Sequence, residues 1–300
     1  MVDLFRLYIF FLFLVLLAYG NKLPGLRVYL KDTIRLSEGS FVPSINIKSI
    51  SRRNEIHKIN QESFRLRVFN EHGEYLAKVV DVGLLKDSVS LEIESQLRSL
   101  SEDKTATQLN LIFVPSKKMP RLKTCIEACV ALGVDAFYPI YTSKSSKSSD
   151  NRFSEHAQKQ IRDAIIEGMT QSERLAPLPK YHSNGDQGNS LLSTVYGIIK
   201  ANERGANGSA ACETRVFLCV EPRFNDGQSV KPFIEALFTS PAQSYHDYII
   251  IGPEGGFQEN EIKELLAFKE VLPVSLNEGV LRSEVAAISA VSIYSCFYAQ

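Results

Sequence analysis

The sequence predicts an α/β protein in which a small β domain precedes a larger domain built on a parallel sheet. A length of 300 residues is enough chain for two such domains. Residues 109–115, 120–132 and 136–140 have the patterns of a strand, a helix and a strand, which together make a βαβ unit. The chain before them alternates polar and apolar residues, which is typical of antiparallel strands and hairpins.

The overall composition is that of an ordinary globular protein. Apolar residues make up 44% of the chain, charged residues make up 23%, and the net charge is zero. The total charge therefore gives no indication of a polyanionic partner, and any surface for nucleic acid must be a local patch. Five cysteines form no C-x-x-C pair and no zinc-like set with the five histidines. We expect buried free thiols and no metal site.

Residues 1–20 are expected to be a signal peptide. An unbroken apolar run over residues 7–18 is short for a membrane span but typical of a secretory signal. Ala18 and Gly20 then occupy the positions that a signal peptidase reads. Residues 21–63 carry eight Lys or Arg against four acidic residues, which is compatible with a transit peptide. A membrane anchor and a mis-annotated start are the alternatives.

The small β domain is assigned to residues 21–94. Residues 65–70 and 75–80 alternate on either side of a turn that contains a glycine, which predicts a hairpin. Residues 95–108 are polar with mixed charge, so we interpret them as a linker. The larger domain then occupies residues 109–300.

A glycine-rich turn near the C-terminal end is the strongest local signal in the chain. The apolar run 248–251 predicts a buried strand, and residues 259–266 have helical spacing with acidic residues in the first turn. Between them the chain reads G-P-E-G-G, over residues 252–256. A strand, a glycine turn and a helix form the place where open α/β sheets bind ligands. The turn matches neither common phosphate fingerprint, and a plain β-to-α turn is the alternative reading.

A second motif follows at residues 281–286, which read L-R-S-E-V-A after a predicted strand over 271–276. In this order and at this separation, the two motifs resemble the RsmE family of ribosomal RNA methyltransferases. That family belongs to the SPOUT class of knotted S-adenosylmethionine enzymes. The resemblance implies a SPOUT-type parallel sheet with a C-terminal trefoil knot, preceded by a PUA-like or OB-like β-barrel that helps to hold RNA.

The resemblance also implies that S-adenosylmethionine binds between two loops, where backbone groups read its adenine. The residues assigned to this cofactor are Gly252, Pro253, Glu254, Gly255, Gly256, Leu276, Asn277, Val280 and Leu281. Asn277 replaces a glycine that the family often has, and asparagine is the non-glycine residue that best tolerates a left-handed backbone.

The implied reaction places a methyl group on N3 of a uridine in small-subunit ribosomal RNA. Attack by a ring nitrogen requires no covalent nucleophile, so positioning and electrostatics carry the transfer. Arg282 is assigned to the uracil oxygen or to an adjoining phosphate. Glu284 is assigned to orienting Arg282 or to assisting proton removal, and a purely structural role as a helix N-terminal acid is the alternative.

Ribosomal RNA of the small subunit is the implied partner, and four further residues are assigned to it. Lys144 and Arg152 lie in a basic loop that would meet phosphates, or that is only solvated. Gln171 and Arg174 end a segment similar to the family's E-A-x-E-Q-S-x-R, and they would read phosphate or a base edge, or would only cap a helix. The apolar C-terminal helix suits a homodimer or a core position equally.

Two alternatives to this function remain open. One is a SPOUT methyltransferase that acts on another RNA. The other is a degenerate RNA-binding or ribosome assembly factor, which is suggested by departures from the family pattern at Ala128, Ala131, Thr170, Asn277 and Val285. We expect an organelle location, in a plastid (an apicoplast) or a mitochondrion, without stable membrane association after signal removal. A mis-annotated start would instead imply the cytoplasm.

Overall fold

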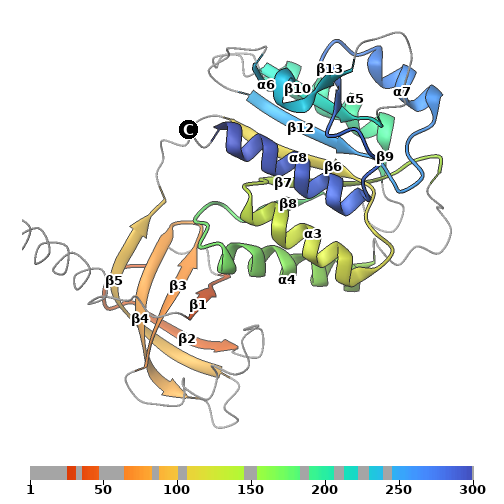
Figure 1. Cartoon of the computed structure of the whole chain (residues 1–300). Coiled ribbons are helices and arrows are strands. Elements are labelled where there is room, and N and C mark those ends of the chain that lie inside the picture. Colours follow the sequence, from red (N-terminus) through yellow and green to blue (C-terminus); the bar gives the residue numbers. More distant parts are fainter. Residues whose placement is uncertain are drawn as a thin grey trace, which may run out of the picture. The chain divides into compact units, whose positions relative to one another are not determined.

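The chain forms two compact units, residues 1–100 and residues 101–300, in a computed structural model (Figure 1). The residues that the structure describes are 26–31, 36–46, 64–82, 88–100, 107–144, 154–182, 189–205, 213–221, 230–238 and 245–298. The predicted signal peptide lies outside them. Within them, no helix is both long and apolar enough to cross a membrane.

The N-terminal unit is a five-stranded sheet. Its strands are β1 (Arg27–Tyr29), β2 (Phe41–Asn46), β3 (Arg65–Asn70), β4 (Gly73–Val82) and β5 (Ser88–Ser99). The order is β1-β3-β4-β5-β2, with β1 parallel to β3 and the other neighbours antiparallel. Asn70 pairs with Gly73, so the predicted hairpin is confirmed. Closure of this sheet into a PUA-like barrel stays a prediction.

The predicted linker begins too early. Strand β5 continues to Ser99 and pairs with β4 as far as Gly73, so the first part of the interval 95–108 belongs to the sheet. Arg98 forms an ion pair with the buried Glu74 in this stretch. A strand whose polar side chains serve internal ion pairs has the composition of a linker, and that is why the sequence pattern misplaced the boundary.

The C-terminal unit is built on an eight-stranded parallel sheet. Its strands are β6 (Gln108–Phe113), β7 (Ala136–Tyr141), β8 (Lys180–Tyr181), β9 (Asn189–Ser190), β10 (Glu213–Cys219), β11 (Lys231–Pro232), β12 (Tyr245–Ile251) and β13 (Val271–Ser275). The order is β11-β13-β10-β12-β6-β7-β8, and β9 pairs with β7. Strands β6 and β12, far apart in the chain, are neighbours at its centre. The predicted βαβ unit is confirmed as β6, α3 and β7.

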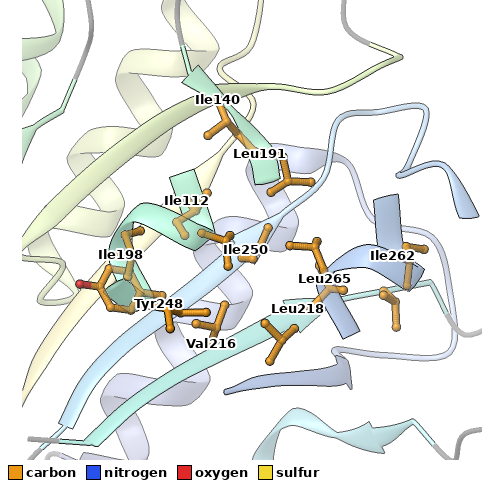
Figure 2. Close-up of a cluster of buried hydrophobic side chains, with 14 of the residues drawn as sticks. Ile112, Ile140, Leu191, Ile198, Val216, Leu218, Tyr248, Ile250, Ile262 and Leu265 are labelled. Carbon is orange, nitrogen blue, oxygen red and sulfur yellow. The ribbon is translucent and has the colours of Figure 1, made fainter. Parts of the chain in front are cut away.

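Helices cover both faces of this sheet (Figure 1). They are α3 (Met119–Ala131), α4 (Glu155–Gln171), α5 (Leu191–Gly205), α6 (Phe233–Phe238), α7 (Glu259–Leu266) and α8 (Ser283–Tyr298). Helix α3 packs against both α4 and α8, whereas α5 and α7 contact each other. Side chains of α5 and α7 bury Ile112, Val216 and Ile250 from three adjacent strands in one apolar cluster (Figure 2).

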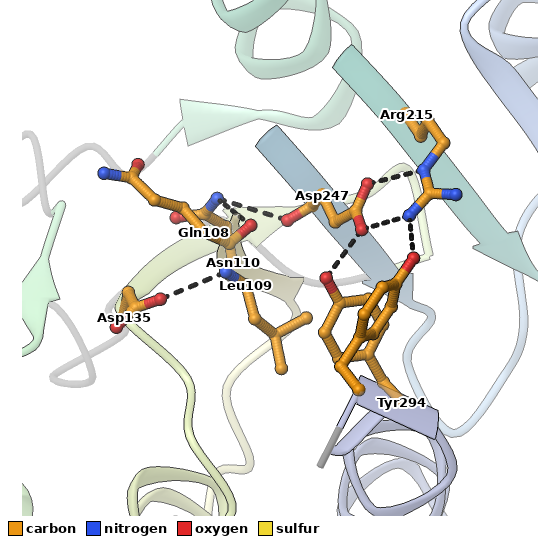
Figure 3. Close-up of polar contacts among 8 residues, drawn as sticks. Gln108, Leu109, Asn110, Asp135, Arg215, Asp247 and Tyr294 are labelled. Atoms are coloured by element: carbon orange, nitrogen blue, oxygen red, sulfur yellow. Dashed lines mark hydrogen bonds and ion pairs between the residues drawn. The ribbon is translucent and has the colours of Figure 1, made fainter. Parts of the chain in front are cut away.

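A buried polar network fastens α8 to the sheet (Figure 3). Arg215 of β10 donates to both carboxylate oxygens of Asp247 of β12, at 2.8 and 2.5 Å. Tyr294 of α8 donates to Asp247 at 2.6 Å, and Arg215 donates to Tyr298 at 2.6 Å. Burial, together with the charge of Asp247 and the hydrogen bond to it, raises the pKa of the Tyr294 hydroxyl. The network therefore holds the C-terminal part of α8 against strands β10 and β12.

Candidate functional site

The predicted glycine turn follows the central strand β12 and leads into α7. Gly256 has a φ of +66°, and its N–H donates to the carbonyl of Pro253 at 2.9 Å. A Cβ on Gly252 would lie 2.9 Å from the ring of Phe257. Two of the three glycines are therefore required by the loop itself, one for its left-handed backbone and one for close packing. A Cβ on Gly255 would meet only the Lys144 side chain, at an ordinary 3.6 Å.

Side chains from the segment after β7 and from α7 hold this loop in place. The Lys144 ammonium group donates to the carbonyl oxygens of Gly255 and Phe257, at 2.8 and 3.0 Å. Glu261 accepts from the backbone and hydroxyl of Ser143 at 2.8 and 2.6 Å, and from the backbone of Gln258 at 2.9 Å. Burial acts to raise the pKa of Glu261, but these hydrogen bonds and Lys144 outweigh it and hold the pKa below its ordinary value.

The second predicted loop joins β13 to α8 and faces the glycine loop. The two loops and the end of β10 enclose a cavity of about 260 Å³, here called the loop cavity. Eight of the nine residues predicted to bind the cofactor line it: Gly252, Pro253, Gly255, Gly256, Leu276, Asn277, Val280 and Leu281. The sequence motifs therefore predicted the walls of this cavity well.

Further wall residues were not predicted from the sequence. Cys219, Val220 and Glu221 line the loop cavity from the end of β10, and Ile262 lines it from α7. A parallel arrangement of β10 and β12 could have predicted these residues, because the carboxyl ends of parallel neighbours lie at the same edge of the sheet. Burial raises the pKa of the Cys219 thiol to about 12, so this sulfur is a neutral apolar wall rather than a nucleophile at neutral pH.

A second cavity of about 450 Å³, here called the α3 cavity, adjoins the first. Glu254 and Glu284 line it, although Glu254 had been predicted to bind the cofactor. Arg121, at the start of α3, lies between them: its guanidinium is 3.8 Å from Glu254 and 3.5 Å from Glu284. Arg121 was not predicted, because no local sequence pattern marks an arginine that meets its partners only in the fold.

The structure separates the two predicted catalytic residues. Glu284 lines the α3 cavity, and its side chain is 16% exposed. Arg282 is exposed and lines neither cavity, and its assignment to the uracil oxygen or to an adjoining phosphate stays a prediction. The reason is local: Ser283 begins α8, and the residues on either side of Arg282 face the loop cavity while its own side chain faces solvent.

The residues predicted to bind RNA have mixed outcomes. Arg174 donates to the carbonyls of Val130 and Val134 at 3.0 and 2.6 Å and to Asp135 at 2.6 Å. Its guanidinium thus stabilises the end of α3, which corrects its assignment to RNA. Gln171 is exposed at the end of α4 and donates to Glu167 at 2.8 Å.

Of the two residues from the basic loop, Lys144 donates to the glycine loop, and its contact with an RNA phosphate stays a prediction. Arg152 lies outside the described residues. Among the described cysteines, Cys125, Cys129, Cys219 and Cys296 are free thiols. In the described part of the chain, no three His, Cys, Asp or Glu side chains come together to hold a metal ion.

Comparison with known proteins agrees with this geometry. A family profile described as RNA methyltransferase domain matches residues 103–295. The chain belongs to this family. Ribosomal RNA small subunit methyltransferase E of Rickettsia conorii is 27% identical over 228 residues, which cover 76% of this chain and 78% of that protein. The resemblance to the RsmE family is thereby confirmed.

Solved structures share the fold of this RNA methyltransferase family member. The Legionella pneumophila protein Lpg2936, in complex with S-adenosylmethionine, is 22% identical with a TM-score of 0.68 over 91% of this chain and 97% of its own. Ribosomal RNA small subunit methyltransferase E of Neisseria gonorrhoeae, bound to S-adenosylmethionine, is 18% identical with a TM-score of 0.62 over 92% and 98%. The predicted α/β class is confirmed, and the trefoil knot stays a prediction.

Proposed function

We propose that this RNA methyltransferase transfers the methyl group of S-adenosylmethionine to N3 of a uridine in small-subunit ribosomal RNA. The observation that carries the proposal is the loop cavity, which both motif loops line as the RsmE resemblance implies. The relatives in Rickettsia conorii and Neisseria gonorrhoeae, whose names specify small-subunit ribosomal RNA, support the choice of RNA.

The residues of the loop cavity fit an adenosine-bearing sulfonium. Ile251, Ile262 and Leu276 supply apolar walls for a flat ring. The glycine loop lines the same cavity, so its backbone would read the adenine edge as the resemblance implies. Glu221 and Glu259 add two carboxylates, which favour a ligand that carries positive charge.

The chemistry is a single displacement. The N3 proton leaves to a base, the electron pair left on N3 attacks the methyl carbon, and the carbon–sulfur bond breaks with its electron pair on sulfur. The chain must therefore align the ring with the methyl carbon, exclude water and receive one proton. The neutral thiol of Cys219 suits this route, because a covalent intermediate through cysteine is not required.

We extend the proposal to a homodimer that acts in an organelle. Val285 is 44% exposed on α8, and Phe238 is 71% exposed on α6, where its ring contacts that of Phe297. Exposed apolar side chains on these packed helices suit a subunit interface. Sedimentation of the purified protein tests the dimer. Cell fractionation tests the location, and the finding of all mature protein in a cytosolic extract contradicts it.

The proposed function is tested by methyl transfer from labelled S-adenosylmethionine to small ribosomal subunits that lack the modification. Reverse transcription then maps the product, because a methyl group on N3 blocks base pairing and stops the polymerase. We expect one stop at one uridine. Incorporation into another RNA, or at a ribose, contradicts the assignment. Cofactor binding without any transfer favours a non-catalytic RNA-binding factor.

A further inference from the structure

The loop cavity and the α3 cavity are neighbours with a shared wall. Lys144, Pro253, Gly255 and Ser283 line both of them. A ligand in the α3 cavity would therefore contact the same loop that holds a ligand in the loop cavity. Together they provide adjoining places for the two reactants of a group transfer.

The α3 cavity is lined by Arg121, whose N–H groups remain available as hydrogen-bond donors. The Arg121 guanidinium approaches Glu254 and Glu284 only at 3.8 and 3.5 Å, which are ion-pair distances longer than hydrogen bonds. Among the described residues it makes no hydrogen bond, so its five N–H donors are available to a ligand. The side chain is 36% exposed, which places these donors within reach of the cavity.

The carboxylate of Glu284 is the complementary group. Its side chain is only 16% exposed, and Arg121 is its ion-pair partner within the described part of the chain. A largely buried carboxylate beside a guanidinium offers one strong acceptor next to several donors. Lys117 and Lys118 are exposed along the same cavity, where they can meet the phosphates of an incoming strand.

We propose that the α3 cavity receives the target pyrimidine and that the Arg121–Glu284 pair reads its imide edge. The inference rests on the proposed function and adds the residues that select the base. Uracil presents N3–H between two carbonyl oxygens. Glu284 accepts the N3–H bond, and Arg121 donates to an adjacent carbonyl oxygen. Cytosine has no proton on N3, so the same pair disfavours it.

The Arg121–Glu284 pair also supplies the base that receives the N3 proton. Glu284 first takes the N3 proton, the electron pair left on N3 then forms the bond to the methyl carbon, and the sulfur of the methyl donor keeps the electron pair of the bond that breaks. Negative charge that spreads onto the uracil oxygen faces the Arg121 guanidinium. Both residues thus act as catalytic residues, with Glu284 as the base and Arg121 as the electrostatic stabiliser.

The experiment compares Glu284→Gln and Arg121→Gln in the full chain, with Glu264→Gln and Arg162→Gln as controls on exposed surface. The substrates are small subunits reconstituted on RNA that carries uridine or 5-fluorouridine. Fluorine withdraws electrons and makes N3–H more acidic, so that loss of a base matters less. Binding of S-adenosylmethionine by calorimetry shows whether each variant is folded and whether its loop cavity is intact.

We expect Glu284→Gln to slow methyl transfer by roughly 100-fold or more, and Arg121→Gln by about 100-fold. The affinity for S-adenosylmethionine should stay within about threefold, since the pair lies outside the loop cavity. The Glu284→Gln defect should shrink by about tenfold on 5-fluorouridine, because the more acidic substrate needs less help from a base.

Two outcomes overturn the inference while the proposed function stands. A Glu284→Gln defect that is equal on both substrates would leave Glu284 with a structural role only. A loss of S-adenosylmethionine affinity in Arg121→Gln, with normal turnover at saturation, would assign the α3 cavity to the amino-acid end of the methyl donor. Failure of the unmutated chain to methylate any RNA rejects the proposed function itself, and the inference with it.

Discussion

Lys144 donates hydrogen bonds from its ammonium group to the carbonyl oxygens of Gly255 and Phe257, and so connects the segment after β7 to the glycine loop. The contact joins two segments more than a hundred residues apart in the chain, at a separation of 111 positions for Gly255. This exposed lysine thus stabilises the glycine loop, which forms the wall between the two cavities.

Replacement of Lys144 by methionine should loosen this wall and weaken cofactor binding. The methionine keeps most of the apolar stem but removes two charge-assisted hydrogen bonds, each worth on the order of 1 kcal/mol when exposed. We expect S-adenosylmethionine affinity to fall by roughly 3- to 10-fold in calorimetry. Lys159→Met on α4 is the matched control, and equal affinity in both variants contradicts the role of Lys144.

The glycines of the loop should differ in their tolerance of a methyl group. Gly256 has a φ of +66°, so Gly256→Ala forces an L-residue into the left-handed region at a cost of about 1–2 kcal/mol. Gly255→Ala makes only an ordinary 3.6 Å contact with Lys144. Urea unfolding should therefore show a loss of stability for Gly256→Ala and little change for Gly255→Ala. The reverse order would refute this account of the loop.

The Asp247 network should be the most sensitive polar site of the C-terminal unit. Asp247→Asn leaves the buried Arg215 charge without its carboxylate, which typically costs about 3–5 kcal/mol. Tyr294→Phe removes one hydrogen bond to Asp247 and should cost about 1–3 kcal/mol. Tyr196→Phe, at a side chain that is 53% exposed, is the control in denaturant unfolding. Equal stability of all three variants contradicts the prediction.

Glu261 should make the stability of the C-terminal unit fall in acid. Its pKa in the folded chain lies below the unfolded value of about 4.3, so its contribution is fully present above that pH. The contribution is lost as the pH falls below about 4.3 and through the lower pKa of the folded state. Urea titrations from pH 7 downward should show the gap between wild type and Glu261→Gln closing in this window. Glu264→Gln should keep the wild-type slope.

Sequence patterns predicted the features that depend on neighbouring residues. The strand, glycine turn and helix around Gly252–Gly256 appear as predicted, because period and turn chemistry are local properties. The hairpin across Asn70 and Gly73 is confirmed for the same reason. The order of the two motifs also predicted the two loops that line the loop cavity.

Features that depend on distant partners could not be predicted in this way. Arg121 meets Glu284 across 163 residues (284 − 121), and nothing near either residue indicates the other. Arg174 looked like an RNA ligand, since its partners Val130 and Val134 contribute backbone carbonyls that a sequence pattern does not display. Arg282 lines neither cavity, because a shift of one residue at the start of α8 decides which side chain faces the loop cavity.

The order of strands at the centre of the sheet has a consequence for synthesis of the chain. Strand β6 leaves the ribosome early. Strand β12 covers one edge of β6 but is synthesised much later: Asn110 of β6 and its hydrogen-bond partner Asp247 of β12 are 137 residues apart. At roughly 5–20 residues per second this delay is roughly 7 to 27 s. Throughout that interval the nascent chain presents an apolar strand with an open edge, which invites pairing with other chains. Productive expression should therefore depend on chaperones that hold the nascent chain until its last quarter emerges.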